Sequence, residues 1–200
     1  MHMFEELSLD NPGVLWGRLP DDTFADVKAA IDPAVEAAVP YNDSLVGNIE
    51  MEYKFPLPPS FTEYINHMWC AYRDRFNVWQ GHEYNIPDYA WINLMKKGEY
   101  NPLHIHDGVV SWVAWLEIPY DLQEEIATMS TMRQQYSTAS MFQFVYNKLD
   151  GILSHMNLPI DENWVGSMVM FPAYLKHQVY PFSTSDGYRI SISSNIKLVP

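Results

Sequence analysis

The second half of the chain is a succession of short strand-like segments, and this feature most limits the fold that the sequence can adopt. From residue 89 onward, segments rich in β-branched and aromatic residues are separated by turn signals such as Lys96-Lys97-Gly98. We expect strands at residues 91–95, 102–106, 109–118, 141–146, 167–171, 177–182 and 188–198. So many short strands that look antiparallel predict a β-sandwich or a jelly roll.

The first part of the chain is expected to support this β region. Residues 23–39 have apolar residues near helical spacing, and Pro33 should interrupt that helix or start a second one. Residues 44–55 alternate loosely and predict an edge strand. Ser60 is a predicted N-cap, with Glu63 as its capping-box partner. The helix behind it has one apolar stripe, which consists of Phe61, Ile65, Met68, Trp69, Tyr72 and Phe76.

The predicted class is therefore mainly β with some helix (α+β), a cupin-like jelly roll with supporting N-terminal helices. A chain of 200 residues is the usual size of one compact domain. We expect residues 1–88 to form the helical and edge-strand support and residues 89–200 to form the jelly-roll core. The hydrophobic share of 48% is enough for a sizeable core.

Charge and cysteine content exclude several classes of function. The net charge of −13 repels phosphate backbones, so we expect no nucleic-acid partner. Cys70 is the one cysteine, which rules out an intrachain disulfide and a cysteine-based zinc site. The sequence shows neither a secretory signal nor a membrane-spanning stretch, and we expect a soluble, cytoplasmic protein without a membrane partner.

Two histidines separated by one residue, His104 and His106, are the first candidates for chemistry. Residues two apart on a strand point to the same side, so both imidazoles should project from one face. Neutral imidazole binds iron, zinc, copper and nickel. A His-x-His pair also occurs by chance among solvated histidines. The pair indicates a metal site more strongly here because of a third histidine, His177, which follows a proline-containing turn at the start of a later strand.

The last predicted strand has one polar and one apolar face. At a period of two, Arg189, Ser191, Ser193 and Asn195 share one face, and isoleucines occupy the other. If the isoleucines pack on helices, the polar row points into the barrel. A buried arginine needs an anion, and its guanidinium fork matches a carboxylate, to which the Ser191 hydroxyl can also donate. That anion is either a ligand or an Asp or Glu of the protein itself.

The order of these residues resembles that of the iron(II) and 2-oxoglutarate-dependent oxygenases, in particular the branch found in phages and marine bacteria. The resemblance is clearest over residues 91–195 and weaker over residues 42–78. It is carried by Trp91-x-Asn93, Gly98, His104-x-His106, Ser111, Phe171-Pro172, His177, Arg189-x-Ser191 and Asn195. The resemblance implies a double-stranded β-helix, which is a jelly roll whose open end holds the metal.

The resemblance also implies a role for each residue of the site. His104, His106 and His177 would bind Fe(II), and Arg189 with Ser191 would bind the distal carboxylate of 2-oxoglutarate. Three further residues are weaker candidates for cosubstrate binding: Asn93, Ser111 and Asn195. With O2, such an enzyme couples oxidative decarboxylation of 2-oxoglutarate to succinate with hydroxylation of a C–H bond in its substrate.

The sequence departs from the family pattern at the second ligand. The family usually has Asp or Glu where His106 stands, which gives a site of two histidines and one carboxylate. A three-histidine site is therefore expected here. Asp107 is the alternative ligand, if a kink at Gly108 turns its side chain inward.

Two other functions remain open from the sequence. One is a cupin-like metalloenzyme that uses the three histidines without 2-oxoglutarate, and the other is a non-catalytic β-sandwich binding module. For the oxygenase we expect a small-molecule or peptide substrate, and a homodimer is a common arrangement for small jelly rolls. Residues 120–139 should form an inserted loop or short helix, either a lid or a plain surface loop.

Overall fold

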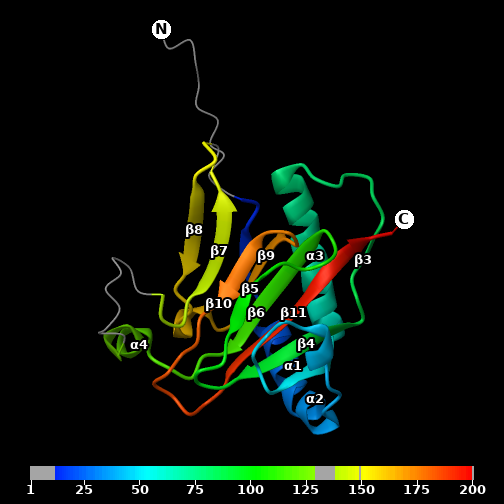
Figure 1. Ribbon diagram of the computed structural model, residues 1–200. Helices are drawn as coiled ribbons and strands as arrows, with labels where there is room; N and C mark the ends of the chain where they lie inside the picture. Colours follow the sequence, from blue (N-terminus) through cyan, green and yellow to red (C-terminus); the bar gives the residue numbers. More distant parts are fainter. Residues whose placement is uncertain (1–11, 129–137, 149, 200) are drawn as a thin grey trace.

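Two antiparallel sheets lie face to face, and helices cover the outer side of the larger one (Figure 1). The computed structural model describes residues 12–128, 138–148 and 150–199. The larger sheet has the order β1-β9-β6-β11-β4-β2, with β3 also paired to β11, and the smaller has the order β5-β10-β7-β8. The strands are β1 (Leu15–Arg18), β2 (Glu52–Pro56), β3 (Tyr84–Asn85), β4 (Tyr89–Met95), β5 (Asn101–His104), β6 (Val110–Glu117), β7 (Phe142–Asn147), β8 (Leu153–Leu158), β9 (Ser167–Pro172), β10 (Lys176–Val179) and β11 (Arg189–Leu198).

Most of the helical residues precede the β region, as the sequence predicts. The α-helices are α1 (Asp21–Ala29), α2 (Ile31–Ala37), α3 (Pro59–Phe76) and α4 (Leu122–Thr128), and the 3-10 helices are η1 (Asn42–Ser44) and η2 (Glu162–Trp164). The predicted class of mainly antiparallel β structure with a few supporting helices is confirmed. In the part of the chain that the structure describes, no helix has the length and apolarity needed to span a membrane.

The apolar stripe of α3 packs on the outer face of the larger sheet. Phe61, Ile65 and Trp69 are fully buried in a core that also contains the apolar face of β11, including Ile192. The ring of Phe61 meets that of Trp112 on β6 edge to face, with 5.4 Å between the centroids. Burying each such side chain contributes about 1.5–3 kcal/mol, so this layer fixes the outer face of the sheet. The inner face is left for the site.

The start of α3 differs from the prediction. The helix begins at Pro59, with Pro58 as N-cap and no side-chain cap, so the prediction that Ser60 caps it is wrong. A proline at the first helical position already has the helical φ and lacks the N–H that a cap would satisfy. The Ser60 hydroxyl instead donates to the Asp26 carboxylate at 2.6 Å, which joins α3 to α1. The break at Pro33 is confirmed, because this residue lies in the first turn of α2.

Several segments near the sheet edges differ from the prediction. The strand expected at 44–55 is shorter and covers residues 52–56, and β1, β3 and β8 were not predicted at all. Each of the three missed strands pairs with one other strand and is partly exposed, so its sequence lacks the apolar alternation of a buried strand. In the insert, residues 122–128 form α4, whereas residues 129–137 lie outside the described residues.

Replacing Phe61 by alanine should lower the free energy of unfolding by about 3–5 kcal/mol, because it removes a fully buried ring and leaves a cavity. Urea denaturation of wild type and variant measures this difference. Leu153→Ala is the control, since that side chain is 70% exposed and its loss should change stability by less than about 0.5 kcal/mol. Equal effects of the two substitutions would contradict this view of the core.

Candidate metal centre

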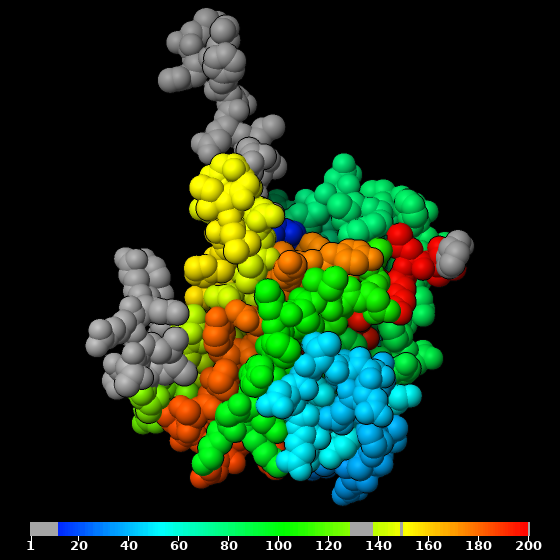
Figure 2. All heavy atoms as spheres, viewed as in Figure 1, coloured from blue at the N-terminus to red at the C-terminus, as the bar shows by residue number. Residues whose placement is uncertain are grey.

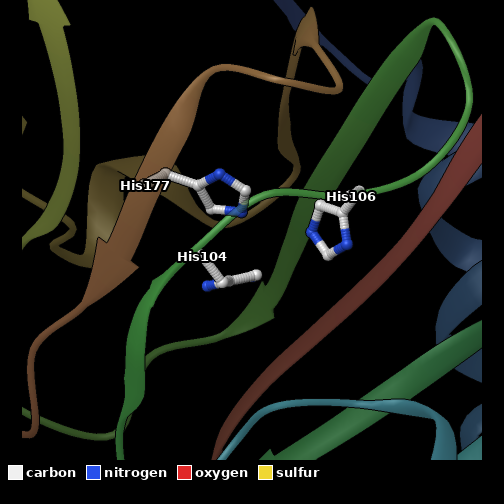
Figure 3. Close-up of side chains that lie close together, drawn as sticks. All are labelled: His104, His106 and His177. Atoms are coloured by element: carbon white, nitrogen blue, oxygen red, sulfur yellow. The ribbon is translucent and has the colours of Figure 1, made fainter.

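Three histidines come together where β5 and β10 pair. His104 is directly opposite His177 in the antiparallel register, so both side chains leave the smaller sheet on the same face. His106 lies two residues beyond the end of β5, and its backbone N–H donates to the Ala173 carbonyl at 2.9 Å. Figure 3 shows the three rings gathered in one place beside β11. One ring nitrogen from each histidine lies within 4.8 Å of the others.

The prediction that His104 and His106 share a strand is wrong, although the grouping that it implied is present. The strand ends at His104, and the contact with Ala173 holds the following segment against the turn between β9 and β10. The His106 ring therefore reaches the cluster from the segment after β5 and not from a strand.

Hydrogen bonds fix which nitrogen two of the rings offer to a metal. His104 Nδ1 lies 2.7 Å from the Pro102 carbonyl, and His177 Nδ1 lies 2.9 Å from the Leu175 carbonyl. A carbonyl only accepts, so Nδ1 is the protonated nitrogen in both rings and Nε2 keeps its lone pair. A backbone carbonyl on the second ring nitrogen is a usual support for a metal-binding histidine.

Burial keeps the three imidazoles neutral. Desolvation lowers the pKa of His104. Desolvation, together with repulsion from His104 when that ring is protonated, lowers the pKa of His106 to about 4. Desolvation also holds the pKa of His177, which is only 3% exposed, well below its usual value. At neutral pH the cluster therefore presents uncharged nitrogen donors, which is the form that binds metals.

Aromatic rings form the wall behind His177. The Phe142 ring of β7 stacks on the imidazole, with 5.5 Å between centroids, and the Phe171 ring of β9 meets it edge to face at 4.9 Å. Trp91 of β4 approaches His106, with 5.6 Å between centroids. These rings leave little room for water on one side of the cluster and restrict the rotamers of the histidines.

Asp107 does not join the cluster. Its side chain is 70% exposed and forms an ion pair with Lys197 at 2.5 Å. It also accepts a hydrogen bond from Asn195 Nδ2 at 3.1 Å. Gly108 has the positive φ of 90° expected of a kink. The Asp107 carboxylate nevertheless contacts side chains of β11 and does not turn toward the histidines. The structure therefore gives no support to Asp107 as the alternative ligand.

Arg189 lies on the opposite wall of the cavity that the histidines line. The residue is 2% exposed, and its guanidinium donates to the carbonyls of Ser140 and Tyr180 at 3.0 and 2.9 Å. It also donates to the Tyr120 hydroxyl at 3.1 Å, and Nη2 lies 2.6 Å from the sulfur of Met95. These contacts fix the position of the group without neutralising its charge.

No carboxylate of the described residues forms an ion pair with Arg189. The alternative in which the arginine pairs with an Asp or Glu of the protein is therefore not what the structure shows. A thioether is a weak acceptor, so the N–H that faces Met95 is available to a stronger acceptor from a ligand. A buried guanidinium without an anion is the feature expected of an anion-binding wall.

The other predicted cosubstrate residues separate into two pairs. Ser191 and Asn93 line the cavity, and Asn93 Nδ2 donates to the Ser191 hydroxyl at 3.4 Å. Ser111 and Asn195 do not line it, and the Ser111 hydroxyl donates to Asn195 Oδ1 at 2.7 Å. The structure thus brings the first pair to the site and leaves the second pair beside it.

Glu52 of β2 is a cavity residue that the sequence did not indicate. It is 2% exposed and lines the same cavity as the three histidines and Arg189. A charged residue at an expected edge strand is normally a surface residue. The available signal was weak, because alternation in residues 44–55 did not reveal which face of the strand turns inward.

Comparison with known proteins gives one family and several similar folds. A family described as putative 2OG-Fe(II) oxygenase matches residues 89–195. No curated protein sequence matches the chain. Among solved structures, a Pseudomonas putida prolyl-4-hydroxylase has a TM-score of 0.54 and 16% identity, over 95% of this chain and 94% of that one.

Two further structures have a similar fold. A prolyl hydroxylase from Trichoplax adhaerens, in complex with a hypoxia inducible factor oxygen degradation domain peptide fragment, has a TM-score of 0.58 and 12% identity, over 95% of this chain and 84% of that one. OsALKBH1 has a TM-score of 0.56 and 11% identity, over 93% of this chain and 99% of that one. At these identities the likeness shows the fold alone, and the fold is the predicted double-stranded β-helix.

His104→Ala and His177→Ala should each lose Fe(II), because each removes one of the three nitrogen donors that converge in the cavity. Iron per chain, measured after anaerobic loading and desalting, tests this, and circular dichroism shows whether each variant is folded. His155→Ala is the matched control, since that histidine is exposed on β8. A folded variant of either kind with one iron per chain would overturn the assignment.

His106→Asp should keep iron binding, because a carboxylate at this position completes a two-histidine, one-carboxylate site. Asp107→Ala should change iron affinity little, since its carboxylate pairs with Lys197 on the surface. Iron titrations of both variants test the order of effects. Loss of the metal in Asp107→Ala together with its retention in His106→Ala would show that the third ligand is Asp107.

Proposed function

The chain belongs to the putative 2OG-Fe(II) oxygenase family, and on that premise we propose that it hydroxylates a C–H bond of a small molecule or peptide, with 2-oxoglutarate and O2 as cosubstrates. We propose further that the whole chain acts as one domain. Within the family, the sequence pattern favours the branch found in phages and marine bacteria, and this placement stays a prediction.

One arrangement carries the proposal: three neutral histidines line the same cavity as a buried arginine that pairs with no carboxylate of the described residues. A metal and an anion could therefore occupy that cavity together. A dicarboxylate that also chelates the metal meets both requirements. 2-Oxoglutarate is such a compound, with a carboxylate and a keto oxygen at one end and a second carboxylate at the other.

The donor set fits Fe(II). Imidazole nitrogen is a ligand that iron shares with zinc, copper and nickel, and three ligands leave further positions open on an octahedral ion. We propose that His104 and His177 bind through Nε2, because Nδ1 of each is held by a backbone carbonyl. The proposed third ligand is His106, which has no competing hydrogen bond among the described residues.

The opposite wall fits the far carboxylate of 2-oxoglutarate. Arg189 would supply charge and a free N–H direction toward Met95. The Ser191 hydroxyl accepts from Asn93, so its own proton remains available to a carboxylate oxygen. Both residues lie on the inner face of β11, where the backbone pairing with β4 and β6 fixes their positions.

The protein's own contribution to catalysis is position and exclusion of water. When bound, the iron and 2-oxoglutarate supply the oxidising chemistry, in which decarboxylation to succinate is coupled to C–H hydroxylation. The histidines fix the metal, Arg189 fixes the cosubstrate, and the aromatic wall of Phe142 and Phe171 keeps water from the side of His177.

The two alternative functions explain fewer of these features. A cupin-like enzyme without 2-oxoglutarate would leave the buried charge of Arg189 without an anion. A binding module with surface histidines does not account for the burial of His177. A thermal-shift screen with Fe(II), Mn(II) or Zn(II), each with and without 2-oxoglutarate, separates the three functions. Only the oxygenase predicts stabilisation by 2-oxoglutarate that depends on the metal.

Arg189→Met should weaken 2-oxoglutarate binding about ten- to a hundredfold while iron binding is retained, because a charge-assisted hydrogen bond contributes about 1.5–3 kcal/mol. Arg189→Lys should recover part of the loss, since a point charge does not reproduce the guanidinium fork. Anaerobic calorimetric titration of the iron-loaded proteins measures both effects. If the Met variant binds 2-oxoglutarate like the wild type, or the wild type does not bind it, the proposed function is wrong.

A further inference from the structure

A buried carboxylate lies on the same inner sheet face as the proposed cosubstrate residues. In the register of the larger sheet, Glu52 is opposite Asn93, and Asn93 is opposite Ser191. The three residues thus form one row across β2, β4 and β11. With about 4.8 Å between neighbouring strands, the backbone of Glu52 lies about 10 Å from that of Ser191.

Within the described part of the chain, Glu52 has no cationic partner. The side-chain hydrogen bond that it accepts there comes from Asn42 Nδ2, which donates to Oε2 at 3.3 Å. Lys54, two residues along the same strand, lies over the rings of Tyr41 and Tyr89 instead, with Nζ at 6.0 and 4.7 Å from the ring centroids. Burial, with a contribution from the charge of Glu99, raises the pKa of Glu52 to about 7. A carboxylate in this condition gains from any cation that enters the cavity.

Two amide oxygens also lie in this corner of the cavity. Asn93 Oδ1 is buried and has no hydrogen-bond partner among the described residues. A methyl group built on Gly47 would lie 2.3 Å from Asn101 Oδ1 and 2.9 Å from Glu52 Oε1, so these two oxygens surround the same point. Asn48 forms a bridge with Tyr100, the residue before β5, and in Figure 2 the light-blue segment that includes Gly47 lies against green residues.

We propose that this corner, formed by Glu52, Asn93, Asn101 and Gly47, binds a cationic nitrogen of the substrate, either an ammonium or a guanidinium group. Such groups carry several N–H donors and no acceptor, which is the complement of a carboxylate beside two amide oxygens. The inference rests on the proposed function, because it assigns a substrate class to the same site.

Two opposite charges in the cavity favour different positions for 2-oxoglutarate and for a cationic substrate. Arg189 attracts the dicarboxylate to β11, whereas Glu52 repels it from β2 and attracts a cation. Glu52 and Ser191 are two strands apart, so the two charges act on different parts of the cavity. The substrate and the cosubstrate would therefore occupy opposite ends of one cavity.

A groove at the surface adjoins the inner cavity, and we propose it as the route by which a cation reaches this corner. It has a volume of about 400 Å³ and shares Trp91, His104 and His106 with the inner cavity. Its wall includes Tyr41 and Tyr89, the rings over which the Lys54 ammonium already lies. Aromatic faces attract cations, and the net charge of −13 also raises the local concentration of cations.

Matched pairs of ligands test the proposal on the full-length protein loaded with Mn(II) and 2-oxoglutarate. Nα-acetyl-L-arginine is compared with Nα-acetyl-L-citrulline, and Nα-acetyl-L-lysine with Nα-acetyl-L-norleucine. Each pair differs mainly in side-chain charge, because the acetyl group removes the charge of the α-amino group. We expect a cationic member to bind the wild type about ten- to a hundredfold more tightly than its neutral partner by calorimetry. Glu52→Gln, which keeps the shape and removes the charge, should abolish this preference.

Two controls keep the outcomes distinct. Glu50→Gln removes an exposed carboxylate that pairs with Lys96, and it should leave the preference intact. Gly47→Ala places a methyl group in steric overlap with Asn101 Oδ1 and Glu52 Oε1. This displaces the two oxygens and should remove the preference even if Glu52→Gln fails to fold. Equal binding of charged and neutral partners, binding of neither cation, or a preference that survives in a folded Glu52→Gln or Gly47→Ala variant overturns the proposal.

Titration of 2-oxoglutarate is run in parallel on the same proteins. Metal-dependent 2-oxoglutarate binding without a preference for cations would overturn only the substrate class. Absence of 2-oxoglutarate binding in the wild type would instead overturn the proposed function itself. Retained 2-oxoglutarate binding in Glu52→Gln is the expected result, because Glu52 lies two strands away from Ser191.

Discussion

The pairing of β5 with β10 is the interaction on which the candidate site depends. It sets His104 opposite His177, and side chains alternate between the two faces of a strand. A slip of one residue in this register would turn one histidine away from the cavity and leave the other without its partner. The pairing of β10 with β7 on its other side, where His177 is opposite Phe144, opposes such a slip. The geometry of the cluster thus follows from backbone hydrogen bonds.

Polar groups between the sheets are tolerated because the outer face of the larger sheet is packed independently. Ile190 and Ile192 of β11 lie in the core with α3, while Arg189 and Ser191 of the same strand point inward. An arginine without an anion destabilises the folded protein, and hydrogen bonds to two backbone carbonyls offset part of that cost. The remaining cost is the driving force for binding an anion. Glu52 is a buried carboxyl group without a cationic partner among the described residues, so the cost of burying its charge favours binding of a cation.

The sequence predicted the parts of the structure in which a local pattern has one structural meaning. The alternation in β11 placed Arg189 on the inner face, and the apolar stripe of α3 placed its buried face. Prediction failed where tertiary contacts decide. Ser60 lost its capping role to the prolines before it, and His106 reaches the site from a segment held by Ala173 rather than from a strand. Glu52 was missed because its burial depends on η1 and the following loop, and the local sequence of β2 does not encode that cover.

The site is divided between two supports, and this division affects the two kinds of recognition differently. The metal-binding histidines belong to the smaller sheet and the segment after it, whereas Arg189 lies on β11, between β4 and β6 in the larger sheet. β2, which carries Glu52, lies at the edge of the larger sheet, and its outer side has one bridge, between Tyr53 and Pro40, among the described residues. The hydrogen bonds that hold the ring nitrogens of His104 and His177 come from other segments. Substrate preference can therefore change at β2 with little effect on the ring positions of the histidines. Asn93, which donates to Ser191, couples the corner to the cosubstrate wall, because residues with shared partners do not contribute independently.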